Sequence, residues 1–313
     1  TLIDAIVEKG RVQYPDKIRF ATYTLRYDRG PGITVHALEK HWARASVESD
    51  RTGNAVTVKT ENVAGFTLWV GNAEEGRFVV TIDGTELNVR VPKKGAGNPN
   101  GWPFWKVDGK WVNKRETSQA DQLRKRHGLQ GPIDDAFMSS FVMVKPGGRP
   151  MNSKTADWAE AEMKHAITHW RSQFRGDAVV KGDNEVTKED IANSNLILWG
   201  DPMSNAYIGK IIDKLPIKWT AEGVKVGKDL YEHGKHMPVL IYPNPLNPAK
   251  YVVINSGFTF REYDYLNNAR QVPKLPDYAV IDITTPPNAR YPGKVVRAGF
   301  FGEKWELQDN DGK

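Results

Sequence analysis

Polar residues with possible binding chemistry follow three apolar runs in the second half of the sequence. The runs are residues 136–144, 195–199 and 251–254, and the polar residues after them are Arg149, Asn152, Asp201, Ser204, Asn205, Asn255, Ser256 and Arg261. If the runs are neighbouring parallel strands, the loops that follow them meet at one edge of the sheet. That edge is where open α/β sheets usually bind ligands.

The side chains at this edge favour a small polar ligand. Helix amides would attract an anion there, but the carboxylate of Asp201 opposes one, so a neutral polyol or an amide is an equally good candidate. The same side chains are also good caps. Asp201-Pro202 is typical of a helix start, because Asp accepts hydrogen bonds from free amides and Pro fits the first helical position. Both interpretations stay open, and we favour Asp201 as the cap of the helix expected over 203–215.

Other catalytic and metal-binding patterns are weak or absent. The sequence holds no cysteine, no G-x-S-x-G elbow, no P-loop and no G-x-G-x-x-G turn. His165 and His169 have the spacing of two ligands on one helix face, but no third ligand can be named, so we predict no metal and no cofactor. Asp134 and Asp135 are adjacent, and adjacent side chains of an extended chain point to opposite sides, so we expect a capped turn there.

Composition limits the class of protein. The 313 residues carry a net charge of +6, but the basic residues are interspersed with acidic ones, which argues against nucleic-acid binding. No apolar stretch approaches the roughly 20 residues that cross a bilayer, and the opening residues do not have the pattern of a signal peptide. The ten tryptophans suggest a platform for sugars or peptides, although most of them are expected to fill cores.

The periodicity predicts an antiparallel, β-rich, sandwich-like domain followed by an α/β domain with a mainly parallel sheet. Residues 1–9 read as the end of a preceding helix, 10–115 as the β-rich domain, 116–130 as a linker, and 131–313 as the α/β domain. Alternating runs joined by Thr52-Gly53-Asn54, by Asp83-Gly84 and by Asp108-Gly109 predict three hairpins.

Two helices are expected inside these domains. The first covers 34–45 and would turn Val35, Leu38 and Trp42 inward. The second covers 154–174, with a core-facing stripe that comprises Trp158, Met163, Ala166, Ile167, Trp170 and Phe174. Strands alternate with helices after residue 131, and this alternation is the basis for the predicted parallel sheet.

Several long segments resemble a known kind of protein. They include IRFATYTLRYDR, RKRHGLQGPIDDAFM, LILWGDPMSN and LIYPNPLNPAKYVVINSGFTFREYDYLNNARQVPKLPDYAVID, and the resemblance spans roughly residues 14–307. They are similar to the C-terminal region of large secreted bacterial proteins that resemble prolyl oligopeptidases and esterases, of the planctomycete type. Ser139 departs from the acidic residue expected at its position.

The resemblance implies an accessory role. In such proteins the α/β-hydrolase domain with its catalytic Ser, Asp and His precedes this region, so we expect the chain to be non-catalytic, secreted or periplasmic, and partnered by that upstream domain. It would shape substrate access or bind a polymeric carbohydrate or peptide. The alternative is a free-standing hydrolase that acts on an ester or glycan at the strand exits.

Overall fold

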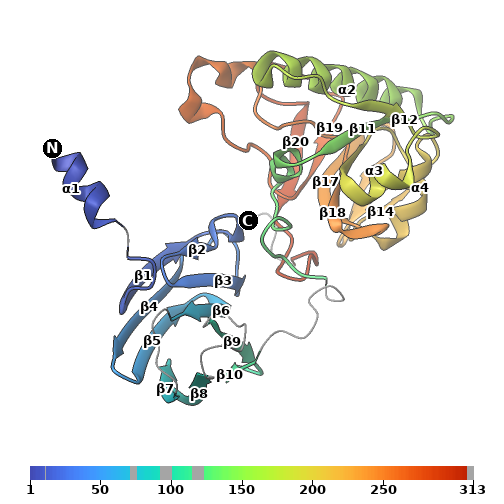
Figure 1. Ribbon diagram of the computed structural model, residues 1–313. Helices are drawn as coiled ribbons and strands as arrows, with labels where there is room; N and C mark the ends of the chain where they lie inside the picture. The colour runs from blue at the N-terminus through green and yellow to red at the C-terminus, as the bar shows by residue number, and fades with distance from the viewer. Residues whose placement is uncertain (11, 71–75, 92–100, 115–122, 309–313) are drawn as a thin grey trace. The chain divides into compact units, whose positions relative to one another are not determined.

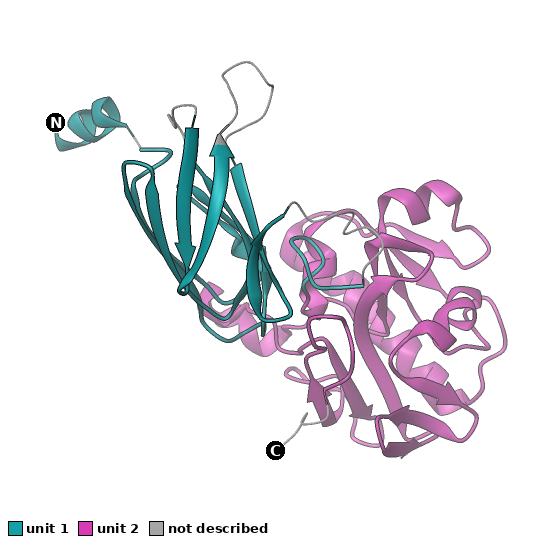
Figure 2. Ribbon diagram, turned by 90° about the horizontal axis from the view of Figure 1, so that it is seen from below, with its two compact units in different colours: residues 1–130 teal, residues 131–313 magenta. Residues whose placement is uncertain are grey.

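The computed structural model describes residues 1–10, 12–70, 76–91, 101–114 and 123–308. Contacts divide the chain into two compact units, residues 1–130 and 131–313 (Figures 1 and 2). The first is β-rich and the second mixes helices and strands, as the sequence predicts, and no described sheet takes strands from both units. None of the described helices is long and apolar enough to cross a membrane. The first part of the predicted linker, residues 116–122, lies outside the described residues.

The first unit begins with helix α1 (Leu2–Lys9) and continues as two five-stranded sheets. One sheet has the order β1-β4-β5-β7-β8, and its strands are β1 (Lys17–Thr22), β4 (Ala45–Thr52), β5 (Ala55–Glu61), β7 (Gly76–Ile82) and β8 (Thr85–Val91). The other has the order β10-β9-β6-β3-β2, and its strands are β2 (Arg29–Gly30), β3 (Ile33–Leu38), β6 (Val63–Trp69), β9 (Gly101–Val107) and β10 (Lys110–Asn113). Apolar side chains from both sheets form one core, so the sheets lie face to face.

The three predicted hairpins are confirmed. β4 pairs with β5 around Gly53, β7 with β8 around Asp83-Gly84, and β9 with β10 around Asp108-Gly109. Asp83 has a φ of 47° and Gly84 one of 85°, the left-handed values that a two-residue hairpin turn requires. Among the described strands of this unit, β5 and β7 form a parallel pair and the other pairings are antiparallel.

The prediction of a helix over 34–45 is wrong, because residues 34–38 belong to strand β3. The pairing of β3 with β6 is irregular at His36, where Val35 faces Phe66 and Ala37 faces Gly65. This bulge places Val35 and Leu38 in the core together, and their three-residue spacing imitates one helical turn. Trp42, also expected inward, is 37% exposed.

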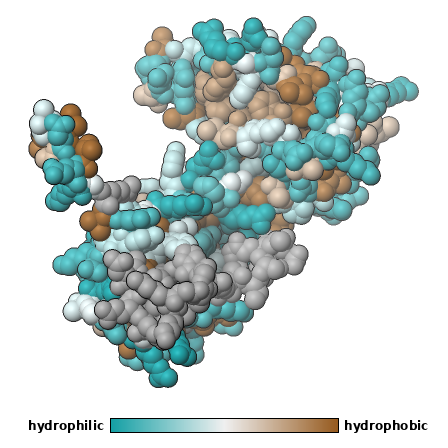
Figure 3. Space-filling view, viewed as in Figure 1, coloured by the Kyte–Doolittle hydropathy of each residue, from teal (hydrophilic) through white to brown (hydrophobic). Residues whose placement is uncertain are grey.

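The apolar residues of α1 lie on one side of the helix, as the sequence suggests. Leu2, Ile3, Ile6 and Val7 are 61–78% exposed. Figure 3 shows this apolar side as a brown stripe along α1. The helix therefore keeps its hydrophobic side in solvent within the described residues.

The second unit holds a seven-stranded sheet of order β12-β11-β13-β18-β17-β19-β20. Its strands are β11 (Phe141–Lys145), β12 (Val180–Gly182), β13 (Asn195–Leu198), β17 (His236–Asn244), β18 (Asn247–Ile254), β19 (Tyr278–Asp282) and β20 (Lys294–Gly299). The helices are α2 (Ser153–Phe174), α3 (Lys188–Asn193) and α4 (Ala206–Ile211), and a small sheet comprises β14 (Lys218–Thr220), β15 (Gly223–Val226) and β16 (Asp229–Glu232). Part of the run predicted as the first strand is instead a 3₁₀ helix, Ile133–Met138.

The large sheet is mixed, which corrects the prediction of a mainly parallel sheet. β12, β11, β13 and β18 run parallel, whereas β17, β19 and β20 continue the sheet with antiparallel pairings. The reason is that β17 and β18 are joined by a short turn at 245–246, which permits only an antiparallel pair. Every residue of β13 is buried, as expected for a central strand.

Helix α2 buries a different stripe from the one predicted. Trp158 and Ala166 are buried as expected, but Phe174 is 43% exposed, and the buried stripe includes Glu162 and His169 instead. Glu162 tolerates burial because the Arg261 guanidinium donates to both of its carboxylate oxygens, at 2.7 and 3.3 Å. The buried face of α2 therefore includes a charged residue that is paired with a distant arginine, which a hydrophobic pattern does not reveal.

Candidate functional site

The structure brings together the three strand exits that the sequence singles out. β11, β13 and β18 are parallel neighbours, so the loops after them share one edge of the sheet. Hydrogen bonds tie these loops to one another: the amides of Gly147 and Gly148 donate to the Ser204 carbonyl at 3.1 and 2.8 Å. The predicted meeting of the three loops at one edge of the sheet is therefore confirmed.

Asp201 binds backbone amides on two different loops. Its Oδ1 accepts from the amides of Met203 at 2.9 Å and Ser204 at 2.8 Å, and its Oδ2 accepts from the amide of Met151 at 2.9 Å. Asp201 is 2% exposed. The prediction that it caps a helix is wrong, because it closes the turn at 201–204 and the helix α4 begins after it.

The cap of α4 is Asn205. Its Oδ1 accepts from the amides of Tyr207 at 3.0 Å and Ile208 at 3.4 Å, while its Nδ2 donates to the carbonyls of Val144 and Trp199. Asn205 is fully buried. One side chain therefore caps the helix and joins the ends of β11 and β13, which leaves no side-chain group free for a ligand.

The side chains of Asn255 and Ser204 also form hydrogen bonds with the backbone. The Asn255 side chain accepts from the amide of Gly200 at 2.8 Å and donates to its carbonyl at 2.9 Å. The Ser204 hydroxyl accepts from the amide of Asp201 at 2.9 Å. The hydroxyl of Ser256 donates to the carbonyl of Gly257 at 3.0 Å. In the part of the chain that the structure describes, no histidine contacts either serine hydroxyl.

The remaining three predicted site residues do not join this cluster. Asn152 caps α2, accepting from the Lys154 amide at 2.9 Å. Arg261 is held by Glu162 and donates from Nε to the Asn288 carbonyl at 3.0 Å. Arg149 is exposed. The structure thus assigns structural bonds to most of the predicted ligand-binding residues.

A small cavity of about 260 Å³ does lie beside these exits. Of the predicted residues only Ser204 lines it, and most of the wall is apolar or backbone, including Pro146, Ala159, Met163 and Gly200. The charged side chains on the wall are Lys145 and Glu160, which the sequence did not point to. The cavity resembles a gap between α2 and the loops more than an assembled catalytic centre.

The histidine pair of α2 is engaged by aromatic and acidic neighbours. His165 Nε2 lies 2.7 Å from Glu262 Oε1, and His169 Nδ1 lies 2.5 Å from the Tyr265 hydroxyl. Burial lowers the pKa of His169 to about 4, so its ring is neutral near pH 7. Among the described residues, no group of three potential ligands lies close enough together to hold a metal ion.

Asp134 and Asp135 are both buried and have separate partners. The amide and hydroxyl of Thr259 donate to the carboxylate of Asp134, and the hydroxyl of Tyr251 donates to Asp135 at 2.7 Å. Burial raises the pKa of Asp134 to about 7. They belong to a 3₁₀ helix rather than to the capped turn that we expected, and they anchor that helix against β18 and the segment after it.

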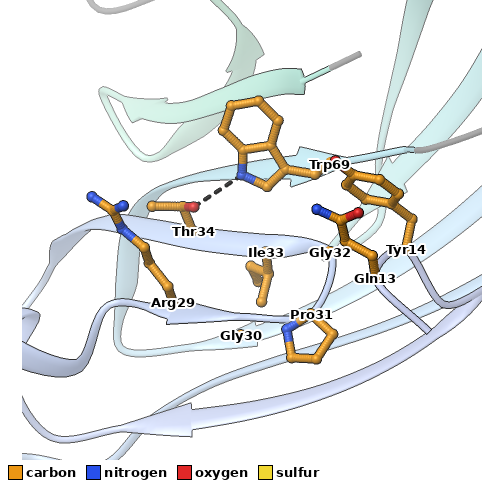
Figure 4. Close-up of a pocket in the computed structure, with 9 residues that line it drawn as sticks. All are labelled: Gln13, Tyr14, Arg29, Gly30, Pro31, Gly32, Ile33, Thr34 and Trp69. Atoms are coloured by element: carbon orange, nitrogen blue, oxygen red, sulfur yellow. Dashed lines mark hydrogen bonds between the residues drawn. The ribbon is translucent and has the colours of Figure 1, made fainter. Parts of the chain in front are cut away.

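A larger pocket, of about 640 Å³, lies in the first unit (Figure 4). The residues around it are Gln13, Tyr14, Arg29, Gly30, Pro31, Gly32, Ile33, Thr34 and Trp69. Ile33 and Val35 of β3 face the core between the sheets, so Thr34 points from the opposite, outer face of the sheet. The pocket therefore opens on the outer face, where side chains are not needed to build the core.

Trp69 forms the flat wall of this pocket, and three features fix its ring. Its Nε1 donates to the Thr34 hydroxyl at 2.9 Å. Gly101 is its direct partner in the pairing of β6 with β9. A Cβ built on Gly101 would lie 2.8 Å from Cζ3 of the ring, so the indole rests on the glycine backbone. The ring is thus held before any ligand arrives.

A second tryptophan in the same strand pair provides a comparison. Trp105 lies opposite Gly65, and a Cβ on Gly65 would be 2.5 Å from Cε3 of its ring. Here the ring is covered, because the Arg124 guanidinium lies 5.0 Å from its centroid and Trp105 is only 8% exposed. Both tryptophans lie on a glycine of the neighbouring strand, and Trp69 is the one that lines the pocket of Figure 4.

No known protein family matches the chain. The comparisons with curated proteins and with solved structures likewise find no match.

The ten tryptophans suggest a platform, but local sequence patterns do not single out Trp69. Trp69 ends an apolar run and reads as core, and Gly101 lies 32 residues later on a strand whose register no local pattern reveals. The sequence does hold a relevant pattern, because Gly and Trp are four residues apart in both segments, at Gly65 and Trp69 and at Gly101 and Trp105. In an antiparallel pair of strands this spacing places each Trp opposite a Gly. That signal requires knowing that the two strands are neighbours.

Proposed function

We propose that this chain is a non-catalytic accessory region of a secreted α/β-hydrolase, and that its first unit holds a polysaccharide substrate. The observation that carries the proposal is the pre-set indole of Trp69 in an open pocket on the outer face of a sheet. The C–H face of a sugar ring packs well against a flat aromatic ring, and fixing that ring beforehand reduces the entropy lost on binding.

The groups around Trp69 suit a sugar better than a peptide. Gln13, Tyr14 and Thr34 line the pocket and carry polar side-chain atoms that can bond to sugar hydroxyls. Extended peptides are usually bound by a free sheet edge with side pockets, or by a hydrophobic groove. The flat indole with a polar margin lacks the apolar depth of such a groove. A carbohydrate is therefore the polymer that we propose.

An accessory role for the second unit is supported by the strand exits. Asp201, Ser204, Asn205 and Asn255 satisfy one another and the backbone, which is the pattern of a scaffold. In the combined protein, the first unit would keep the polymer close to the upstream hydrolase domain. Tethering of this kind raises the effective concentration of substrate without altering the chemistry.

Affinity gel electrophoresis of the full chain against a panel of soluble polysaccharides tests the proposal. We expect at least one polysaccharide to retard the chain, and Trp69→Ala to abolish the retardation. Tyr23→Ala is the matched control, because Tyr23 is 55% exposed and does not line the pocket. If no polysaccharide retards the chain while a soluble polypeptide does, the carbohydrate proposal is wrong.

A free-standing hydrolase would be recognised by a different experiment. Turnover of model esters or glycans by this chain alone, lost in Ser204→Ala or Ser256→Ala, would replace the accessory proposal. The hydrogen bonds of both hydroxyls to the backbone make that outcome unexpected.

A further inference from the structure

We propose that the Trp69 pocket selects an acidic sugar, one that carries a carboxylate or a sulfate, and that Arg29 receives the acid group. This inference rests on the proposed polysaccharide-binding function and names the class of its ligand. Among the described residues that line the pocket, Arg29 is the one with a formal charge. A positive group beside a sugar-binding platform, without an acidic group on the wall, favours an anionic ligand.

The register of the sheet puts Arg29 and Trp69 on either side of Thr34. Arg29 of β2 is the direct partner of Thr34 on β3, so both side chains leave the same face of the sheet. Trp69 donates to the same Thr34 from the opposite side. Figure 4 shows this order, with the guanidinium on one side of Thr34 and the indole on the other. Side chains on adjacent strands are about 5 Å apart, so the positions of Arg29 on β2 and Trp69 on β6, with β3 between them, are about 10 Å apart.

An ion pair with Asp28 orients the guanidinium of Arg29 through one of its three nitrogens. Its Nε lies 3.3 Å from Oδ1 of Asp28. The Asp28 side chain is 7% exposed, whereas the Arg29 side chain is 70% exposed. The same Oδ1 of Asp28 also lies 3.4 Å from His127 Nδ1, so Arg29 shares this carboxylate with a second group. The two terminal nitrogens of Arg29 have no partner among the described residues. Such a fork binds two oxygens of a carboxylate or sulfate at once.

The geometry therefore predicts how one sugar would bind. Its C–H face would lie on the indole of Trp69, and its acid group would extend past Thr34 to the terminal nitrogens of Arg29. Because the charged contact is exposed, its contribution should weaken as ionic strength rises. A neutral sugar could still stack on Trp69 but would lack the second contact.

The test compares three kinds of polymer with the full chain by affinity gel electrophoresis and isothermal titration calorimetry. The polymers are polygalacturonate, which carries carboxylates, a sulfated galactan, and the neutral polymers galactan and xylan. We expect acidic polymers to bind more tightly, and Arg29→Gln to weaken them roughly ten- to hundredfold while leaving neutral binding unchanged. The carboxylated and sulfated arms show which acid group is preferred.

Arg77→Gln is the control for net charge, because Arg77 is an exposed arginine on β7 of the other sheet. If Arg77→Gln weakens acidic binding as much as Arg29→Gln does, the effect is a general one of charge and the assignment to Arg29 fails. If neutral and acidic polymers bind equally through Trp69, the acidic ligand is wrong but the proposed function stands. If no polysaccharide binds, both are wrong.

Discussion

Replacing Asp201 with alanine should destabilise the second unit much more than the loss of an ordinary helix cap. The carboxylate accepts three backbone hydrogen bonds from two loops, and Asp201 is 2% exposed. The Ser204 amide is deeply buried, and leaving it unpaired costs about 2 kcal/mol. The Met203 and Met151 amides lie nearer to solvent, so each loses about 1 kcal/mol of net hydrogen-bond energy. Together the free energy of unfolding should fall by about 4 kcal/mol, against about 1 kcal/mol for a simple cap.

Urea unfolding followed by circular dichroism measures this difference. Asp201→Asn should lose less, about 2 kcal/mol, because its remaining carbonyl keeps the bonds to Met203 and Ser204 while its amide cannot accept from Met151. Asp157→Ala removes an exposed acid on α2 and should change stability by less than about 0.5 kcal/mol. A folded Asp201→Ala protein that loses 1 kcal/mol or less would refute the reasoning. If the same variant also lost a ligand bound by the wild type, Asp201 would be a binding residue.

Three further outcomes follow from the structure. Burial raises the pKa of Asp134 to about 7 from 3.8, so between these pH values the folded state holds a proton that the unfolded state releases. The free energy of unfolding should therefore fall by up to about 4 kcal/mol as pH rises from about 4 to about 7. Urea unfolding of Asp134→Asn across that range should not show this dependence on pH. Gly101→Ala should tilt the Trp69 ring and weaken polysaccharide binding about tenfold, while Gly176→Ala, in the other unit, should not. A fluorophosphonate probe should label no serine stoichiometrically, and stoichiometric labelling of Ser204 or Ser256 would contradict the accessory role.

Local patterns were sufficient for much of the fold. Asp-Gly pairs identify two hairpins because left-handed backbone is easiest at these residues, and the apolar periodicity of 154–174 identifies α2. The meeting of three strand exits was also predictable, since parallel neighbours end at one edge of a sheet. These features depend on residues near one another in the chain or on general rules of topology.

What the sequence could not show depends on contacts between distant residues. The bulge at His36 gives β3 the spacing of a helix, and only its pairing with β6 reveals a strand. Burial of Glu162 depends on Arg261, which lies 99 residues away. The role of Asp201 was misjudged because α4 begins only at Ala206, with Asn205 as its cap, and because the second carboxylate oxygen of Asp201 accepts from Met151 on the neighbouring loop. The Trp69 pocket likewise requires the register of β6 against β9.

The mixed large sheet has a consequence for how the second unit acquires its structure. β17 and β18 are joined by a two-residue turn, so they can pair after closing a very short loop, whereas β11 reaches β13 only after the whole of α2 and α3. Short loops close sooner, and non-local parallel pairing is slow. We therefore expect amides of β17 and β18 to gain protection before those of β11 in pulse-labelling hydrogen exchange during refolding. Protection of β11 before β17 and β18 would show that the parallel half directs assembly instead, and simultaneous protection would contradict the expected order.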